Sequence, residues 1–171
     1  DYIKRVMALP GDTVEMRGGV FWLNGAPVKK EPMGDFVQRV DQHLLNSAAL
    51  AGRTSPCAWG GVEEQLPDGA RQCRYMQYRE TLPSGVSYAV LDFGETAQDN
   101  WGPRIVPEGH VFMMGDNRDN SQDSRFGQAV GGVGFVPAEF LIGRADRVIF
   151  SSAGRSMLYF WTWRADRFFK A

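Results

Sequence analysis

Residues 115–125 read Gly-Asp-Asn-Arg-Asp-Asn-Ser-Gln-Asp-Ser-Arg, and they follow directly on the apolar run Val111–Met114. Five side chains of this stretch are charged, with both signs present, and two Asn and two Ser add further hydrogen-bonding groups. Ordinary loops are polar, but they rarely alternate Asp and Arg so densely. We expect the turn that follows this strand to hold another part of the protein in place by hydrogen bonds and ion pairs.

The composition favours one mostly β domain, or one domain with a large insertion. The chain has 171 residues, 43% of them hydrophobic, and its 20 Gly and 9 Pro favour strands and turns over long helices. A net charge of −1 argues against nucleic acid as a partner, because phosphate binding needs a basic face. No stretch reaches the roughly 18 apolar residues of a membrane span. The opening lacks an initiator Met and a signal region, which predicts a fragment that begins inside a domain.

The first thirty residues predict a β-meander. Residues 2–8 alternate as a strand does, and strands over Thr13–Met16 and Val20–Leu23 follow. Asn24-Gly25 is the strongest short hairpin signal in the sequence and leads into a strand over Ala26–Lys29.

Further strands are predicted later in the chain, over Tyr75–Leu82, Val86–Phe93, His110–Met114 and Ala145–Phe150. Residues 41–73 are rich in Gly, Pro, Ser and Ala and have weak periodicity, so we expect an insertion with long loops there.

Cys57 and Cys73 lie within that stretch. A bridge between them would close a loop of about 15 residues and stabilise the fold by roughly 3 kcal/mol. Two unrelated thiols of a cytosolic protein are the alternative, because disulfides depend on the compartment. The spacing alone leaves both open.

The C-terminal residues 156–171 are crowded with aromatic side chains and cations. Either a terminal helix packs on its own domain, or the segment lies at a bilayer surface, which suits Trp and Phe flanked by cations. One helical face would carry Leu158, Trp161, Ala165, Phe168 and Phe169.

The charged stretch 115–125 does not fit a calcium loop. A loop that starts at Asp116 puts Arg118 where an oxygen ligand is required. One that starts at Asp119 puts Ser124 in the place of the Gly and Val130 in the place of the closing Glu. A solvated loop with Asx turns is the simplest alternative.

A third interpretation joins this stretch to Lys4. Lys4 and Arg5 interrupt an apolar run, and neighbours in a strand face opposite sides, so one of them tends to point inward. A partly buried Lys loses its proton more easily and can act as a general base. With a Ser to activate and a hydroxyl to orient the amine, this is the Ser–Lys form of nucleophilic catalysis.

Two stretches of the chain resemble motifs of the bacterial type I signal peptidases. Residues 2–12, Tyr-Ile-Lys-Arg-Val-Met-Ala-Leu-Pro-Gly-Asp, are similar to the Lys-Arg…Pro-Gly-Asp box of that family. Residues 115–125 match its Gly-Asp-Asn-Arg-Asp-Asn-Ser-x-Asp-Ser-Arg box, in the right order and about 110 residues further on. Phe135-Val136-Pro137 and residues 141–145 continue the match, whereas residues 30–100 resemble the family only loosely.

The resemblance implies an antiparallel, barrel-like β catalytic domain with a smaller inserted β extension. We expect the catalytic domain to comprise residues 1–30 and 100–155 and to be incomplete at its N-terminus. The extension would comprise residues 31–99, and residues 156–171 would form a separate aromatic-rich segment.

The resemblance also implies a membrane-bound serine endopeptidase that removes N-terminal signal peptides from exported preproteins. Lys4 would be the general base, and Ser121 would orient its amine by a hydrogen bond. Asp123 and Arg125 would form an ion pair beneath the site. The residues that brace the turn would be Asp116, Arg118 and Asp119. No metal or organic cofactor is implied.

The family's nucleophile lies in a Ser-x-Met-x-Pro box upstream of the Lys, and the sequence has no such box. Ser156-Met157 lacks the Pro and the correct order, so we reject it. We expect the nucleophile, an oxyanion-hole donor and the membrane anchors upstream in the same chain, and no activity from this part alone. The catalytic domain would lie on the outer, periplasmic face of the bacterial inner membrane, at the membrane surface. That oxidising compartment favours the Cys57–Cys73 bridge.

Two other classes of protein compete with this interpretation. Self-cleaving repressors are also Ser–Lys peptidases, but they lack the Gly-Asp-Asn-Arg box and usually carry a DNA-binding portion. A degenerate relative of the peptidases could instead be a non-catalytic β-module with a binding or structural role. Apolar spans and a Ser-x-Met-x-Pro box encoded before Asp1 would favour the peptidase, and their absence from the whole gene would favour the module.

Overall fold

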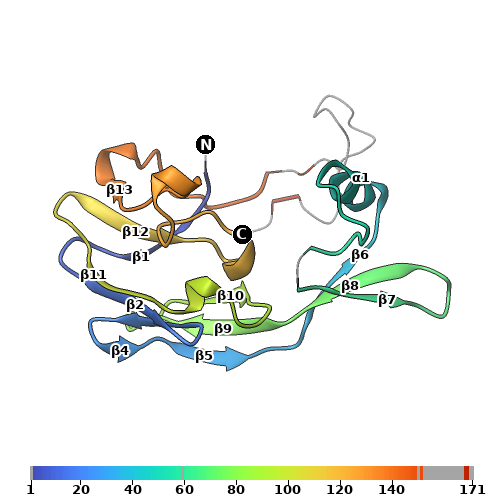
Figure 1. The fold of residues 1–171 in the computed structure, drawn as a ribbon, viewed down its shortest axis with the longest axis horizontal. Coiled ribbons are helices and arrows are strands. Elements are labelled where there is room, and N and C mark those ends of the chain that lie inside the picture. Colours follow the sequence, from blue (N-terminus) through green and yellow to red (C-terminus); the bar gives the residue numbers. More distant parts are fainter. Residues whose placement is uncertain (1, 59, 150, 152–167, 170–171) are drawn as a thin grey trace.

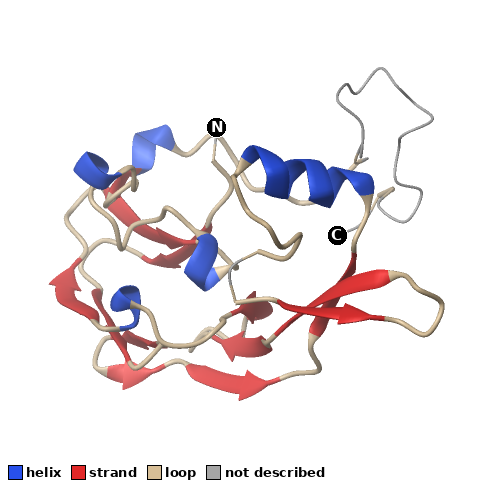
Figure 2. Cartoon of the chain, turned by 45° about the vertical axis from the view of Figure 1, so that its right-hand side comes forward, coloured by secondary structure: helices blue, strands red, loops and turns tan. Residues whose placement is uncertain are grey.

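The computed structural model describes residues 2–58, 60–149, 151 and 168–169, and it is mostly β (Figure 1). Within these residues the strands form four antiparallel sheets, ordered β1-β12-β13, β11-β2-β3-β4, β10-β9-β5 and β6-β8-β7. All four sheets are open, so the mostly β expectation is confirmed but the described part contains no closed barrel. Figure 2 shows α1, the longest helix among the described residues, above the strands.

The elements have the following bounds. The strands are β1 (Arg5–Ala8), β2 (Thr13–Arg17), β3 (Val20–Leu23), β4 (Ala26–Pro27), β5 (Lys29–Pro32), β6 (Phe36–Arg39), β7 (Val62–Gln65), β8 (Arg71–Tyr75), β9 (Gln77–Thr81), β10 (Ser87–Leu91), β11 (Trp101–Ile105), β12 (His110–Met114) and β13 (Val136–Pro137). The helix α1 is Gln42–Leu50, and short 3₁₀ helices lie at Ala97–Asp99, Arg118–Asn120, Gln128–Val130 and Ala138–Phe140.

The predicted meander exists in part. β2, β3 and β4 pair in sequence, and the hairpin turn at Asn24-Gly25 has the positive φ angles, 53° and 80°, that its turn type requires. The strand expected over Ala26–Lys29 is divided, because Lys29 begins β5, which pairs with β9. β1 is shorter than predicted and pairs with β12 instead of the meander. This long-range pairing brings the strand that follows Lys4 beside the strand that precedes the charged stretch.

Two other sequence-based expectations were wrong. In the stretch expected to be long loops, Asp41 caps α1 by accepting the Leu44 N–H at 2.8 Å, and β7 and β8 form a hairpin. A strand was expected over Ala145–Phe150, but the described residues 145–149 are all exposed and contain only a bridge residue at Val148. Their alternation has no sheet face to pack on in the described part of the chain.

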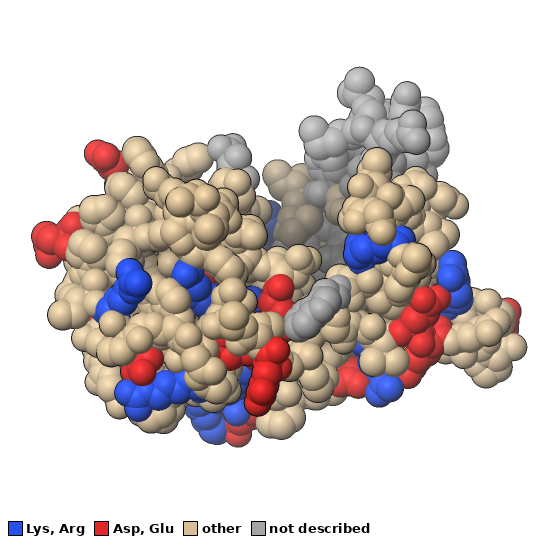
Figure 3. Space-filling model, in the orientation of Figure 1, with Lys and Arg blue, Asp and Glu red and all other residues tan. Residues whose placement is uncertain are grey.

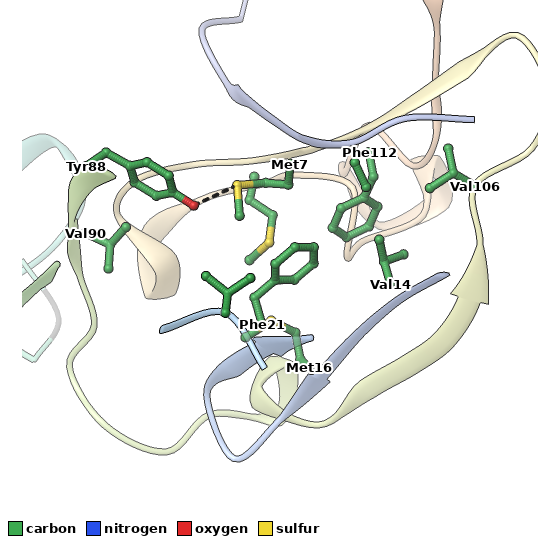
Figure 4. Close-up of a cluster of buried hydrophobic side chains, with 11 residues drawn as sticks. Met7, Val14, Met16, Phe21, Tyr88, Val90, Val106 and Phe112 are labelled. Atoms are coloured by element: carbon green, nitrogen blue, oxygen red, sulfur yellow. Dashed lines mark hydrogen bonds between the residues drawn. The ribbon is translucent and has the colours of Figure 1, made fainter. Parts of the chain in front are cut away.

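The main core lies between the sheets that contain β1–β12 and β2–β3, with β10 at its side (Figure 4). Phe21 and Phe112 stack at its centre with ring centroids 6.0 Å apart. Burying a side chain of this size stabilises a fold by about 1.5–3 kcal/mol. The buried members are Met7, Ala8, Val14, Met16, Phe21, Val28, Tyr88, Val90, Val106, Phe112 and Met114. This core holds the last residues of β1 and of β12, and the charged stretch begins directly after β12.

A second, smaller core lies beside β6, β8 and α1, and it contains a disulfide between Cys57 and Cys73. Tyr75 and Phe93 pack around it with ring centroids 5.2 Å apart. The Tyr75 hydroxyl accepts the Ala58 N–H at 2.9 Å, which holds the segment after Cys57 against the sheet.

Replacing both cysteines with Ala is expected to lower the free energy of unfolding by about 3 kcal/mol, because the open chain gains the entropy of the released loop. Urea unfolding of the variant and the parent protein measures the difference. Labelling of two free thiols in the non-reduced parent protein would contradict the bridge itself.

No helix among the described residues is long and apolar enough to span a bilayer. The interpretations of the C-terminal segment concern residues that lie, apart from Phe168 and Phe169, outside the described part of the chain.

Charged side chains of both signs are interspersed along the lower edge of the molecule in Figure 3.

Candidate active site

The charged stretch 115–125 folds back on the strand that precedes it. Ser124 exchanges two hydrogen bonds with Met113, its N–H donating to the Met113 carbonyl at 3.0 Å and its Oγ accepting the Met113 N–H at 2.9 Å. A 3₁₀ turn at Arg118–Asn120 reverses the chain between them. The dense polar sequence is therefore a compact turn whose side chains mostly point inward.

Lys4 and Ser121 come together at Gly115. β1 and β12 pair with Arg5 opposite Met114, which places Lys4 beside Gly115. A Cβ atom built on Gly115 would lie 2.2 Å from Ser121 Oγ and 3.6 Å from Lys4 Nζ. The absence of a side chain at position 115 therefore leaves the space in which the amine and the hydroxyl approach each other.

The environment of these two groups differs. Lys4 is half-buried. Ser121 Oγ is buried and makes no hydrogen bond to any described residue, Lys4 included. A buried hydroxyl without a partner is uncommon in folded proteins, and it leaves Ser121 with its hydrogen-bonding capacity unused next to the amine.

Asp123 and Arg125 form a fully buried ion pair behind this point. Arg125 donates from Nε to Asp123 Oδ1 at 2.9 Å and from Nη2 to Oδ2 at 3.0 Å, and both side chains have no exposed surface. Asp123 Oδ2 also accepts the Gly115 N–H at 3.1 Å. The pair thus holds the backbone of the glycine at which Lys4 and Ser121 meet.

The other three charged residues of the stretch each bind a different part of the fold. Asp116 accepts two hydrogen bonds from Arg5, both at 2.8 Å, and this pairing raises the pKa of Arg5. Asp119 accepts the Phe93 N–H at 2.5 Å. Arg118 is buried and paired with Glu80 of β9.

Sequence reasoning did not find Glu80 or Tyr88. Glu80 is buried, and the Tyr88 hydroxyl donates to its Oε2 at 3.0 Å. Burial and the nearby Glu80 charge raise the pKa of Tyr88, so its hydroxyl stays protonated as the donor. A charged residue inside an alternating strand normally faces solvent, so the sequence holds no signal for this pair.

The folded protein disfavours the ionised form of the Asp119 side chain. Burial is the largest influence on its pKa and raises it, and the hydrogen bond from the Phe93 N–H lowers it in part. The neighbouring carboxylates Asp92 and Asp99 raise the pKa further, with a smaller opposing effect of Arg125. Its Oδ1 is buried without a hydrogen-bond partner among the described residues, as are Oδ1 of Asp99 and Oδ1 of Asn117.

Asp119→Asn is therefore expected to raise the free energy of unfolding at about pH 7. An acid whose pKa is higher in the folded state destabilises that state once pH rises above it, and the cost vanishes below the unfolded pKa. The gain should shrink as pH falls towards about 4 in urea unfolding. Asp68→Asn is the control, because Asp68 is exposed and also accepts a backbone N–H, that of Ala70. A gain that grows on acidification would contradict the assignment.

Gly115→Ala is expected to displace Ser121, because the new methyl group would overlap its Oγ, and to cost about 1–3 kcal/mol of stability. Urea unfolding and a crystal structure of the variant would measure both effects. Gly127→Ala is the matched control, since Gly127 has a φ of −69° and a methyl group there would meet no described atom within 4 Å. Equal stability of the two variants would show that the site tolerates a side chain at position 115.

A cavity of about 590 Å³ opens beside Lys4. Most of its walls are apolar, and Lys4 is the only Lys or Arg among the described residues that line it. These residues are Tyr2, Ile3, Lys4, His110, Met113, Gln128, Gly132, Val133, Phe135, Val136, Pro137, Phe140, Leu141, Ile142, Gly143 and Ala145. An apolar cavity with a single amine at its edge can hold an extended apolar segment and present one of its polar groups to that amine.

The family model "Signal peptidase, peptidase S26" matches residues 1–150, which include Lys4 and the whole charged stretch. The chain belongs to the signal peptidase family. Signal peptidase I of Rickettsia typhi is 30% identical over 158 residues, covering 88% of this chain and 46% of that protein. Signal peptidase I of Rickettsia canadensis is 29% identical over the same shares.

The chain therefore spans about half the length of the curated signal peptidases it matches. A chain in the crystal structure of a signal peptidase I from Enterococcus faecalis V583 is 22% identical, with a TM-score of 0.36, covering 84% of this chain and 80% of that one. That likeness is too low to add to the family assignment, which rests on the sequence matches.

Proposed function

We propose that this chain supplies the general base and its supporting residues to a type I signal peptidase, which cuts N-terminal signal peptides from exported preproteins. The observation that carries the proposal is the meeting of Lys4 Nζ and Ser121 Oγ at Gly115, beside an apolar cavity. The family match supports the same reaction class. The nucleophilic Ser would come from residues that precede this chain in the whole protein.

In the proposed reaction the uncharged Lys4 amine takes the proton of the Ser hydroxyl as the Ser oxygen attacks the scissile carbonyl carbon. The C–N bond then breaks, and the leaving amine of the mature protein takes that proton from Lys4. A water molecule gives a proton to Lys4 and attacks the acyl-enzyme ester, and the Ser oxygen recovers the proton as the signal peptide leaves. Ser121 would direct the amine by a hydrogen bond in both steps.

The proposed location is the outer face of the bacterial inner membrane, where preproteins emerge. The partners would be preproteins and the membrane surface. The apolar cavity beside Lys4 is suited to the small and apolar residues of a signal peptide.

Incubation of a preprotein with the whole protein, and separately with this 171-residue chain, tests the proposal. Mass spectrometry of the products should show one cleavage by the whole protein and none by the chain alone. Cleavage by the chain alone would contradict an upstream nucleophile. A whole protein that cleaves no preprotein would favour the non-catalytic β-module.

A further inference from the structure

A buried carboxylate outside both family boxes binds a residue of one box directly and is linked to the other through Tyr88. Glu80 of β9 is 1% exposed, and its two oxygens accept hydrogen bonds from Nη1 and Nη2 of Arg118. The Tyr88 hydroxyl of β10 donates to the same carboxylate at 3.0 Å. The proposed reaction uses neither Glu80 nor Tyr88, so their buried polar contacts need another explanation.

The first set of contacts leads from Glu80 to Gly115. Arg118, held by Glu80, offers its backbone carbonyl to Nη2 of Arg125. Arg125 is paired with Asp123, and Asp123 accepts the Gly115 N–H at 3.1 Å. A shift of the Arg118 side chain would therefore pass through three buried contacts to the glycine where Lys4 and Ser121 meet.

The second set leads from Glu80 to the strand of Lys4. Tyr88, oriented by Glu80, lies under the guanidinium of Arg5, whose central carbon is 3.9 Å from the ring centroid. The same hydroxyl contacts Met7 Sδ at 3.3 Å, as Figure 4 shows. Arg5 directly follows Lys4 and pairs with Asp116, which directly follows Gly115. This cation–π contact and ion pair fix β1 against the start of the charged stretch.

The burial of both charges of the Glu80–Arg118 pair favours a positioning role over a stabilising one. The side chains of Glu80 and Arg118 are each 1% exposed, so both charges have lost their hydration. Replacing such a pair with apolar residues of similar volume is often neutral or stabilising, whereas removing one partner is strongly destabilising. A pair of this kind adds little stability over an apolar core, but it defines where the planar guanidinium must lie.

We propose that Glu80 is a positioning residue of the active site, which sets the strand of Lys4 and the turn of Ser121 in register with each other. The inference rests on the proposed peptidase function, which it deepens. It assigns a catalytic purpose to the β9–β10 hairpin, which lies outside the boxes that identify the family.

The test uses the whole protein with two variants and one control. Glu80→Gln removes the charge and keeps the size of the side chain. The double variant Glu80→Leu with Arg118→Met replaces the pair by apolar residues and leaves Met7 Sδ as the partner of the Tyr88 hydroxyl, so it is expected to keep a melting temperature close to the parent's. Glu63→Gln is the control, because Glu63 forms an exposed ion pair with Arg71 on the separate sheet β6-β8-β7.

In preprotein cleavage the double variant is expected to lose about 100-fold in kcat with KM changed less than about twofold, because a misplaced base slows chemistry and not binding. Glu80→Gln should show the same split, and Glu63→Gln should behave as the parent protein. A double variant with the parent's melting temperature and the parent's kcat would overturn the inference.

Amide hydrogen exchange on the same proteins separates this inference from the proposed function. In the double variant the Gly115 and Leu91 amides, which donate to Asp123 and to the Asp116 carbonyl, should exchange at least about tenfold faster, and the β8 amides should not. If the parent protein cleaves no preprotein, the peptidase proposal fails while faster exchange still supports the positioning role. Unchanged exchange at Gly115 in the double variant would overturn that role whether or not the parent cleaves.

Discussion

Lys4→Ala is expected to lower kcat for preprotein cleavage by the whole protein about 10²–10⁴-fold, because the variant lacks the amine proposed to take the proton of the nucleophile. Stability should change by less than about 0.5 kcal/mol, since Lys4 is only half-buried and precedes the first residue of β1. Steady-state kinetics and urea unfolding of the same preparation measure both. If the variant loses activity but is as stable as the parent protein, Lys4 acts in the chemical step and not in folding.

Two further variants sharpen that result. Lys4→Arg keeps the positive charge but cannot give up its proton, so it should be as inactive as Lys4→Ala. Lys29→Ala should keep the parent's kcat, because Lys29 is exposed on β5 and its ion pair is with Glu31, away from the site. An active Lys4→Arg protein would show that Lys4 supplies charge and not a base.

Asp123→Ala is expected to lower the free energy of unfolding by about 3–5 kcal/mol, since it leaves the Arg125 guanidinium buried without its counter-charge. The change also removes the acceptor of the Gly115 N–H, so kcat should fall even where the protein remains folded. Urea unfolding measures the first effect, and the cleavage rate at a temperature well below the transition measures the second.

Asp146→Ala is the matched control for that prediction. Asp146 pairs with Arg144 at 2.9 Å, as Asp123 does with Arg125, but the two side chains are 68% and 87% exposed. An exposed ion pair of this kind contributes about 0–1 kcal/mol to the free energy of unfolding. Similar losses for the two Asp→Ala changes would mean that the buried pair does not hold the turn.

Local signals in the sequence predicted the parts of this fold that depend on local chemistry. The turn at Asn24-Gly25 needs two positive φ angles, which Asn and Gly accept, and the hairpin formed there. The pairing of β1 with β12 depends instead on contacts between residues more than 100 positions apart, for which periodicity holds no information. The helix α1 was missed because only Ala48 of its nine residues is buried, so it has little apolar stripe to detect.

The residues of the candidate site also divide into those that the sequence predicts and those whose role depends on long-range contacts. Lys4, Ser121 and the Asp123–Arg125 pair were named from motif similarity, and the structure brings them around Gly115. Glu80 was missed because its burial depends on the approach of Arg118 from a distant turn. The role of Gly115 was also missed, because the need for a residue without a side chain arises only from Ser121 and Lys4, which lie next to it in the folded protein.

Chemical rescue of Lys4 tests the central claim most directly. A Lys4→Cys variant of the whole protein is expected to cleave no preprotein, and treatment with 2-bromoethylamine converts the new thiol into an amine of nearly the length of lysine. Within the described residues both native cysteines are held in the disulfide, so the reagent has no competing thiol there. We predict that cleavage returns after this treatment and not after alkylation with iodoacetamide. Cleavage by the untreated variant, or no recovery once mass spectrometry shows complete aminoethylation, would contradict a general base at position 4.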